Sequence, residues 1–260
     1  MTILSASRIG ISFGGIKAID DVSFSVSEGQ ILSIIGPNGA GKTTLFNVIS
    51  GLYRADQGEV GLGGQNVTGL PPDDLAARGL SRTFQNLQIF QRMTAAENVM
   101  VGRHLRERCN LFADLFRLPS VTRQNEETHE AALKLLDDVG LRASARAPAG
   151  SLSYGACKRI EIARALAAEP KVLLLDEPAA GCNSVETDEI DRLIRKVAAS
   201  GIAIVLVEHD MKLVMNISDR ILVLNRGKPL LEGTPREVRN DPAVLEAYLG
   251  KHGAREAARA

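Results

Sequence analysis

The residues whose types and spacing predict chemistry most clearly lie in the segment Gly36-Pro37-Asn38-Gly39-Ala40-Gly41-Lys42-Thr43-Thr44. This segment fits the phosphate-loop pattern G-x-x-x-x-G-K-[ST]. Its glycines let backbone N–H groups surround a phosphate, and the helix expected after it would present unpaired amides to the same anion. Lys42 would place a cation at the β- and γ-phosphates, and the Thr43 hydroxyl would bind Mg²⁺. The sequence therefore predicts a site for a nucleoside triphosphate.

Two later segments end in residues that could complete this site. The apolar runs 172–175 and 202–207 are typical of buried strands, and they are followed by Asp176-Glu177 and by Glu208-His209. Ligands of open α/β sheets bind at the carboxyl ends of the strands. We therefore expect one of the two acids Asp176 and Glu177 to hold Mg²⁺ through water and the other to polarise an attacking water. His209 could reach the γ-phosphate, although a histidine at a strand end is more often structural.

Three further residues carry weaker signals when each is taken alone. Gln85 lies at the polar end of an expected strand at 80–86, where a glutamine is usually solvated or structural. Ser153 precedes an expected helix at 158–168, and a serine there is normally a helix cap. Phe13 lies in an expected strand upstream of the phosphate loop. Its position favours a core residue, although an aromatic ring there could also stack on a nucleotide base.

Hydrophobic patterning predicts the elements that must position these residues. Period-two alternation over 9–13 and 22–26 predicts antiparallel strands before the phosphate loop. From about residue 93 to 140 strand signals vanish, and helical periodicity dominates over 95–105 and 126–139. We expect a helical lobe inserted into an α/β core. Its apolar residues Leu111, Phe112, Leu115 and Phe116 are either lobe core, which is slightly favoured, or a docking surface for a partner.

Composition narrows the classes of function. The 260 residues are 45% hydrophobic and 24% charged, as in a soluble globular protein large enough to bury a full core. The 31 Lys and Arg balance the 31 Asp and Glu, so no broad electrostatic field argues for nucleic acid as the main partner. No apolar run is long enough to cross a bilayer, and the N-terminus lacks the pattern of a signal peptide. Cys109, Cys157 and Cys182 lack metal-ligand spacing, and we expect them to be reduced, small buried residues.

The order of these motifs resembles the ATP-binding cassette family, the ATPase subunits of ABC transporters, over essentially the whole chain. The family's phosphate loop falls on 36–44, its glutamine loop on Gln85, its signature on 152–156, its acidic strand end on Asp176-Glu177 and its switch histidine on His209. The resemblance implies an α/β phosphate-loop NTPase core with an N-terminal antiparallel β-subdomain and an inserted α-helical subdomain. The expected division of this single nucleotide-binding domain is 1–92 and 159–250 for the core, 93–158 for the helical subdomain and 251–260 for a tail.

The resemblance also implies roles for individual residues. Glu177, His209, Lys42 and Gln85 would be catalytic, and Thr43, Gln85 and Asp176 would bind Mg²⁺. Phe13 would stack on adenine, which replaces the core interpretation above. Ser153 and Gly155 would complete the ATP site of the opposite cassette in a head-to-tail pair, across a loop at 180–183. The full set expected to bind ATP is Phe13, Gly36, Pro37, Asn38, Gly39, Ala40, Gly41, Lys42, Thr43, Thr44, Ser153 and Gly155.

Within the family, several segments look like the larger ATP-binding subunit of bacterial branched-chain amino acid importers: 82–85, 93–98, 118–120, 208–215 and 247–250. That likeness implies two membrane permeases, a homologous second ATPase subunit (or a homodimer) and, indirectly, a periplasmic substrate-binding protein as partners. It places the chain at the cytoplasmic face of the bacterial inner membrane, with no role for nucleic acid.

Two segments depart from the pattern of that group. Ala156-Cys157 stands where the signature usually continues with Gln and a second polar residue, and Cys182 and Ser184 replace Leu and Pro in the interface loop. These changes leave the rate of hydrolysis open. The alternatives are a cassette for another cargo such as urea or lipopolysaccharide, a soluble non-transport cassette ATPase, and a regulatory module that binds nucleotide without turnover.

Overall fold

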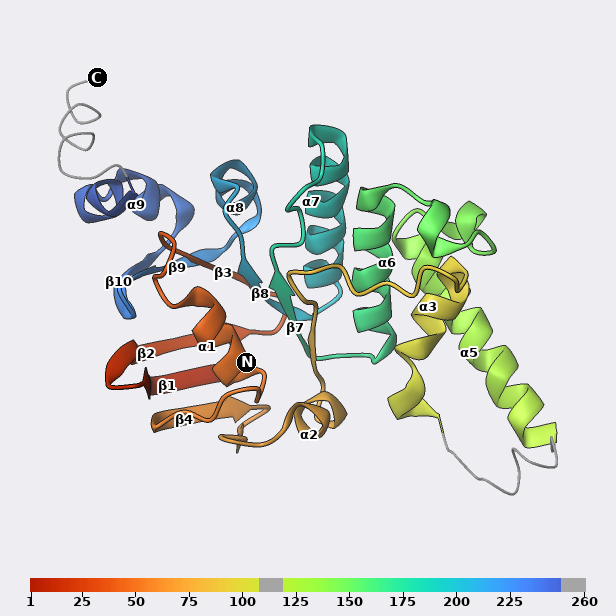
Figure 1. Ribbon diagram of the computed structural model, residues 1–260, viewed down its shortest axis with the longest axis horizontal. Coiled ribbons are helices and arrows are strands. Elements are labelled where there is room, and N and C mark those ends of the chain that lie inside the picture. Colours follow the sequence, from red (N-terminus) through yellow and green to blue (C-terminus); the bar gives the residue numbers. More distant parts are fainter. Residues whose placement is uncertain (108–118, 249–260) are drawn as a thin grey trace.

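Two β-sheets form the body of the molecule in the computed structural model, which describes residues 1–107 and 119–248 (Figure 1). The first sheet is antiparallel, with the strand order β2-β1-β4-β5. The second has the order β10-β9-β3-β8-β7-β6, and all its neighbouring strands run parallel except the edge pair β10–β9. The strands are β1 Thr2–Phe13, β2 Ile16–Ser27, β3 Ile31–Ile35, β4 Gln57–Leu62, β5 Gln65–Asn66, β6 Leu80–Arg82, β7 Val172–Asp176, β8 Ala203–Val207, β9 Arg220–Asn225 and β10 Lys228–Gly233.

The central strands of the second sheet are buried on both faces. Every residue of β3, β7 and β8 is buried, which explains why their sequences are almost continuous apolar runs rather than alternating ones. Their carboxyl ends lie at one edge of the sheet because they are parallel neighbours. The residues that follow these three strands are therefore brought together.

Helices pack around this sheet in two groups. On one side, α1 (Lys42–Ile49) buries Leu45, Phe46 and Ile49 in a core shared with both sheets. On the other side, a second core joins the sheet to α6 (Tyr154–Ala167) and α7 (Ser184–Ala199), and α3 (Ala95–Val101) and α5 (Pro119–Asp138) pack beyond α6 (Figure 1). The shorter helices are α2 Pro72–Ala77, α8 Met211–Ile217 and α9 Pro235–Asn240, with 3₁₀ turns at His104–Arg106, Arg142–Ser144 and Ala149–Ser151.

The expected α/β fold, with its antiparallel N-terminal sheet and inserted helices, is confirmed. Some element ends differ from the predictions. The strand expected over 80–86 ends at Arg82, and the helix expected over 95–105 ends at Val101. The helix expected from residue 186 begins at Ser184 because the Asn183 side chain caps it.

The division into subdomains stays a prediction, and its boundary at residue 158 lies within α6. The apolar residues Leu111, Phe112, Leu115 and Phe116, like Cys109, lie outside the described residues. In the part of the chain that the structure describes, no helix combines the length and the apolar character needed to cross a membrane.

Candidate functional site

The phosphate loop joins the end of β3 to the start of α1, and its backbone requires glycine. A Cβ on Gly36 would lie 2.2 Å from the Leu224 carbonyl oxygen, and one on Gly41 would lie 2.6 Å from Ile19 Cδ1. Gly41 has a left-handed conformation with φ of 102° and is the N-cap of α1, so no side chain caps this helix. The first-turn amides of α1 therefore remain available to an external anion, as a bound phosphate requires.

Lys42 brings its ammonium group back over this loop. Its Nζ donates to the carbonyl oxygens of Gly36 at 2.7 Å and Pro37 at 3.2 Å. Burial lowers the pKa of Lys42, and the negative charges of Glu177 and Asp176 oppose that shift. The cation thus lies within electrostatic range of both predicted acids.

Glu177 is the point at which three of the predicted catalytic residues meet. His209 Nε2 lies 2.7 Å from its Oε1, and Gln85 Nε2 donates to its Oε2 at 3.1 Å. Glu177 also has a positive φ of 50°, although it is not a glycine. Such strained backbone conformations persist where the surrounding structure imposes them, and they cluster at functional sites. The structure thus brings residues that follow β7 and β8 together with Gln85 from the segment after β6.

Asp176 has a buried partner that the sequence analysis missed. Arg82, at the end of the neighbouring strand β6, donates from one terminal nitrogen to Asp176 Oδ2 at 2.9 Å. Its other terminal nitrogen donates at 2.7 Å to Asn47 Oδ1 and Ser50 Oγ of the α1 region. Burial raises the pKa of Asp176 and Arg82 opposes this shift. The sequence did offer a signal for this pair, because Arg82 ends the strand β6 and Asp176 ends the neighbouring strand β7.

Two more buried charges hold the loops around the site. Glu208 accepts hydrogen bonds from the backbone N–H groups of Ala179 at 2.8 Å and His209 at 2.9 Å, so it ties together the loops after β7 and β8. Burial raises the pKa of Glu208. Lys158 of α6 donates to the Gln85 carbonyl oxygen at 3.3 Å. Neither role was predicted, because each depends on backbone positions that only the folded chain defines.

The available donor atoms fit Mg²⁺ but not a metal held by protein alone. Among the described residues, no group of three or more His, Cys, Asp or Glu could hold a metal ion. Thr43 and Asp176 offer a hydroxyl and a carboxylate, the oxygen ligands that Mg²⁺ uses together with water and substrate phosphates. Arg82 bonds only the Oδ2 atom of Asp176. This is the donor set expected where magnesium arrives with a nucleotide.

Phe13 corrects the interpretation that its sequence position favoured. Its side chain is 47% exposed rather than buried in the core. Its ring meets that of Tyr53 edge to face, with centroids 5.4 Å apart. The residue ends β1, so the hairpin that begins at Gly14 carries the ring to the surface. An exposed ring can stack on a base, and this role stays a prediction.

Ser153 and Gly155 lie at the N-terminus of α6, apart from the phosphate loop of their own chain. Ser153 is the N-cap, and its Oγ accepts from the Ala156 N–H at 3.2 Å. Across residues 1–107 and 119–248, no hydrogen bond or ion pair joins Ser153 or Gly155 to residues 36–44. The structure therefore does not bring the two predicted halves of the ATP site together within one chain.

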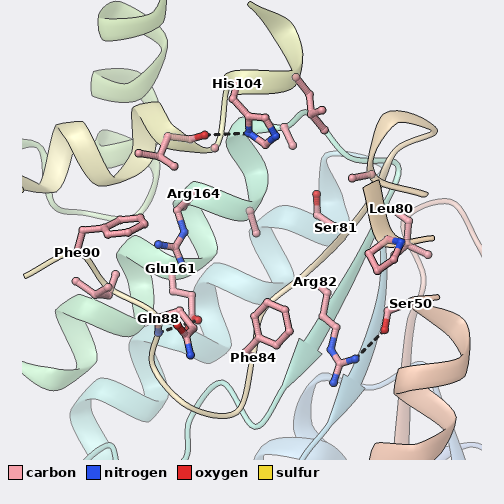
Figure 2. Close-up of a pocket in the computed structure, with 18 of the residues that line it drawn as sticks. Ser50, Leu80, Ser81, Arg82, Phe84, Gln88, Phe90, His104, Glu161 and Arg164 are labelled. Carbon is pink, nitrogen blue, oxygen red and sulfur yellow. Dashed lines mark hydrogen bonds between the residues drawn. The ribbon is translucent and has the colours of Figure 1, made fainter. Parts of the chain in front are cut away.

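An apolar cavity of about 620 Å³ lies next to the segment that carries Gln85, and Phe84 and Gln88 of that segment line it. Figure 2 shows Phe84 in its wall, with Arg82 and Ser50 on one side and Phe90 and Arg164 on the other. Phe84 and Phe90 are 44% and 50% exposed, although both are large and apolar. The cavity shares Arg82 with the ion pair to Asp176. It thus connects an open apolar surface with the acidic end of β7.

Comparison with known proteins identifies the family. The profile described as ABC transporter matches residues 19–180, and one described as Branched-chain amino acid ATP-binding cassette transporter matches residues 228–254. The high-affinity branched-chain amino acid transport ATP-binding protein BraF of Pseudomonas aeruginosa is 46% identical over 96% of this chain and 98% of that protein. LivG of Escherichia coli (strain K12), with the same description, is 44% identical with the same coverage. The lipopolysaccharide export system ATP-binding protein LptB of Acidithiobacillus ferridurans is 37% identical over 95% of this chain and 97% of that protein.

Solved structures agree with this assignment. The ADP conformation of MJ1267, an ATP-binding cassette of an ABC transporter, gives a TM-score of 0.84 at 36% identity and covers 96% of this chain and 100% of that chain. A dimeric post-hydrolysis state of the cassette MJ0796, bound to ADP and Pi, gives a TM-score of 0.75 at 28% identity and covers 90% of this chain and 99% of that chain. The chain therefore belongs to the ABC transporter family, as an ATP-binding subunit that hydrolyses ATP.

Proposed function

We propose that this subunit powers the import of branched-chain amino acids. The observation that carries the proposal is the match of its C-terminal residues 228–254 to the branched-chain amino acid cassette profile, together with 44–46% identity to BraF and LivG over nearly the whole chain. LptB shares less identity, at 37%. Export of lipopolysaccharide is therefore the weaker candidate.

The geometry supports a division of labour in ATP hydrolysis. Glu177 accepts the proton of the attacking water, and His209, already 2.7 Å from it, holds the γ-phosphate. Lys42 turns from the loop carbonyls to the β- and γ-phosphates. Thr43, Asp176 and Gln85 would hold Mg²⁺, which would offset the negative charge that develops on the phosphates. Phe13 stacks on adenine.

The closing of two cassettes onto each other drives transport. Ser153 and Gly155 of one subunit bind the γ-phosphate of the ATP held by the other subunit, because neither residue reaches the phosphate loop of its own chain. ATP then contacts both subunits only in the closed pair, so its higher affinity for that state drives closure. The dimeric neighbour with ADP and Pi supports pairing as such. The partner here is a homologous second ATPase subunit or a second copy of this chain.

The apolar cavity beside Gln85 is the expected contact with the permeases. Its exposed Phe84 and Phe90 suit an apolar helix of a membrane partner, and its wall includes Arg82, the partner of Asp176. Two permeases would hold the subunit at the cytoplasmic face of the inner membrane, and a periplasmic binding protein would deliver the cargo. The helices between residues 93 and 158 would form the subdomain that moves together with the permeases.

Uptake of labelled leucine tests the proposal. Cells lacking this chain should lose leucine uptake, and the wild-type chain should restore it while the Glu177→Gln variant should not. Urea uptake and lipopolysaccharide export should stay unchanged throughout. Leucine uptake that survives loss of the chain, with a defect in either control, would reassign the cargo. Copurification of the chain with two membrane permeases would show a transporter subunit, whereas a soluble cassette ATPase would purify without them.

A further inference from the structure

A carboxylate of this chain already occupies the two donors of the signature segment. Glu186, in the first turn of α7, accepts through its Oε1 from the Ser153 hydroxyl at 2.9 Å and from the Gly155 N–H at 3.1 Å. The contact is close, since a Cβ on Gly155 would lie 2.5 Å from the Glu186 carboxyl carbon. The signature end of α6 is thus filled by an internal anion.

The charge on this carboxylate is favoured by the same contacts. The backbone N–H of Asn183 and the hydroxyl of Ser153 lower the pKa of Glu186, and the Gly155 N–H adds to the shift. Glu186 is therefore ionised at neutral pH. Its Oε1 presents to Ser153 and Gly155 the kind of acceptor that a phosphate oxygen would present.

The contact with the signature is not needed to cap α7. Glu186 caps the helix through its other oxygen, Oε2, which accepts from the Asn183 N–H at 3.2 Å. Within the described residues, two other helices have a capping box of this kind, with Glu97 on α3 and Glu237 on α9, and each box is complete with its own threonine. The Oε1 bonds of Glu186 are thus an addition to an ordinary cap.

We propose that Glu186 competes with the γ-phosphate for the signature segment and so sets the ATP concentration at which two subunits close. The inference rests on the proposed function, which assigns Ser153 and Gly155 to the ATP of the opposite subunit. Two anions cannot both accept from the same hydroxyl and the same N–H at these distances without strong repulsion. Closure therefore requires the Glu186 Oε1 to leave both donors, while its Oε2 can keep the cap of α7.

The charge-neutral variant Glu186→Gln tests this competition in the assembled transporter, with its permeases and second ATPase subunit. Glutamine keeps the capping box but removes the charge that opposes the phosphate. We expect the ATP concentration for half-maximal closure, measured as vanadate-trapped nucleotide, to fall about tenfold. Glu237→Gln makes the same change in the capping box of α9 and should leave that concentration unchanged. Thermal unfolding of both variants controls for a loss of helix stability.

The outcomes separate this inference from the proposed function. A Glu186→Gln transporter that needs the same ATP concentration as the parent, or more, overturns the competition and makes Glu186 a residue that holds the signature in place. A similar fall in Glu237→Gln also overturns it, because the effect would then belong to capping boxes in general. A parent complex that traps no nucleotide at any ATP concentration overturns the proposed function, and this inference with it.

Discussion

Two parts of the candidate ATP site pair their charged groups in different ways. The phosphate-loop half contains the loop at 36–44 with Asp176 and Glu177, and the signature half contains Ser153 and Gly155. In the phosphate-loop half, Asp176 is held by a buried arginine, and Glu177 contacts two side chains from other strand ends. In the signature half, Ser153 and Gly155 lie at a helix N-terminus and meet the carboxylate of Glu186. The first half contains a buried ion pair at a strand end, and the second is an exposed capping box.

This difference indicates what each half does. Under the proposed function, Asp176 and Glu177 act on the bound nucleotide, and contacts within the chain already hold both carboxylates. Ser153 and Gly155 would bind the nucleotide of another subunit, and the contact with Glu186 that holds them would be exchanged for it. The proposal thus gives the subunit one prepared half-site and one replaceable contact.

The largest expected effect comes from the prepared half. Arg82→Met removes one partner of an ion pair whose side chains are only 8% and 4% exposed. A buried charge left unpaired costs about 3–5 kcal/mol, so the free energy of unfolding in urea should fall by about that amount. Arg123→Met is the matched control, because its pair with Glu127 is 81% and 63% exposed and should contribute less than about 0.5 kcal/mol. Equal losses in the two variants would remove the contrast between the buried and the exposed contacts.

A smaller effect is expected on the affinity of the free chain for ATP, which should depend on the phosphate-loop half and not on the signature half. Lys42→Ala should weaken ATP binding to the free chain about 10- to 100-fold, since a hydrogen bond to a charged group contributes about 1.5–3 kcal/mol. Ser153→Ala should leave that affinity unchanged, because Ser153 does not reach the phosphate loop of its own chain. Titration with a fluorescent ATP analogue measures both. Weaker binding by the Ser153 variant would mean that the signature acts within one chain.

The smallest expected effect is on how the free energy of unfolding changes with pH. Glu208 in the phosphate-loop half and Glu186 beside the signature should change it in opposite directions. Burial raises the pKa of Glu208 above its ordinary value of 4.5, so the folded chain keeps a proton that the unfolded chain loses. Its contribution to stability therefore falls as the pH rises through 4.5 toward the raised pKa. The lowered pKa of Glu186 gives a contribution that is complete above 4.5 and is lost as the pH falls through the lowered value.

Urea unfolding at a series of pH values reports these signs. Glu208→Gln should make the slope of the unfolding free energy against pH more positive just above pH 4.5. Glu186→Gln should make that slope less positive below pH 4.5. Changes of the same sign in the two variants would show that the two carboxylates do not have the opposite environments described here.

Sequence reasoning reached most of the fold and the phosphate-loop half because both depend on local pattern. The buried strands before Gly36, Glu177 and His209 are continuous apolar runs, and their parallel order brings the following residues to one edge. Arg82 and Glu186 were missed as partners because each contact joins segments far apart in the chain, 94 and 31–33 residues away. Phe13 was placed in the core by its pattern alone, whereas the turn after β1 exposes it.

The measurement that tests the central claim most directly is phosphate release with Mg·ATP, by the wild-type chain and by Glu177→Gln, each assembled with its partner subunits. The prepared half-site predicts turnover in the wild type, despite Ala156 and Cys157, and a loss of about 10²- to 10⁴-fold in the variant. ATP binding should be kept, with nucleotide trapped in the closed pair. Wild-type turnover by Glu177→Gln would contradict the account, because Glu177 would then not act on the attacking water.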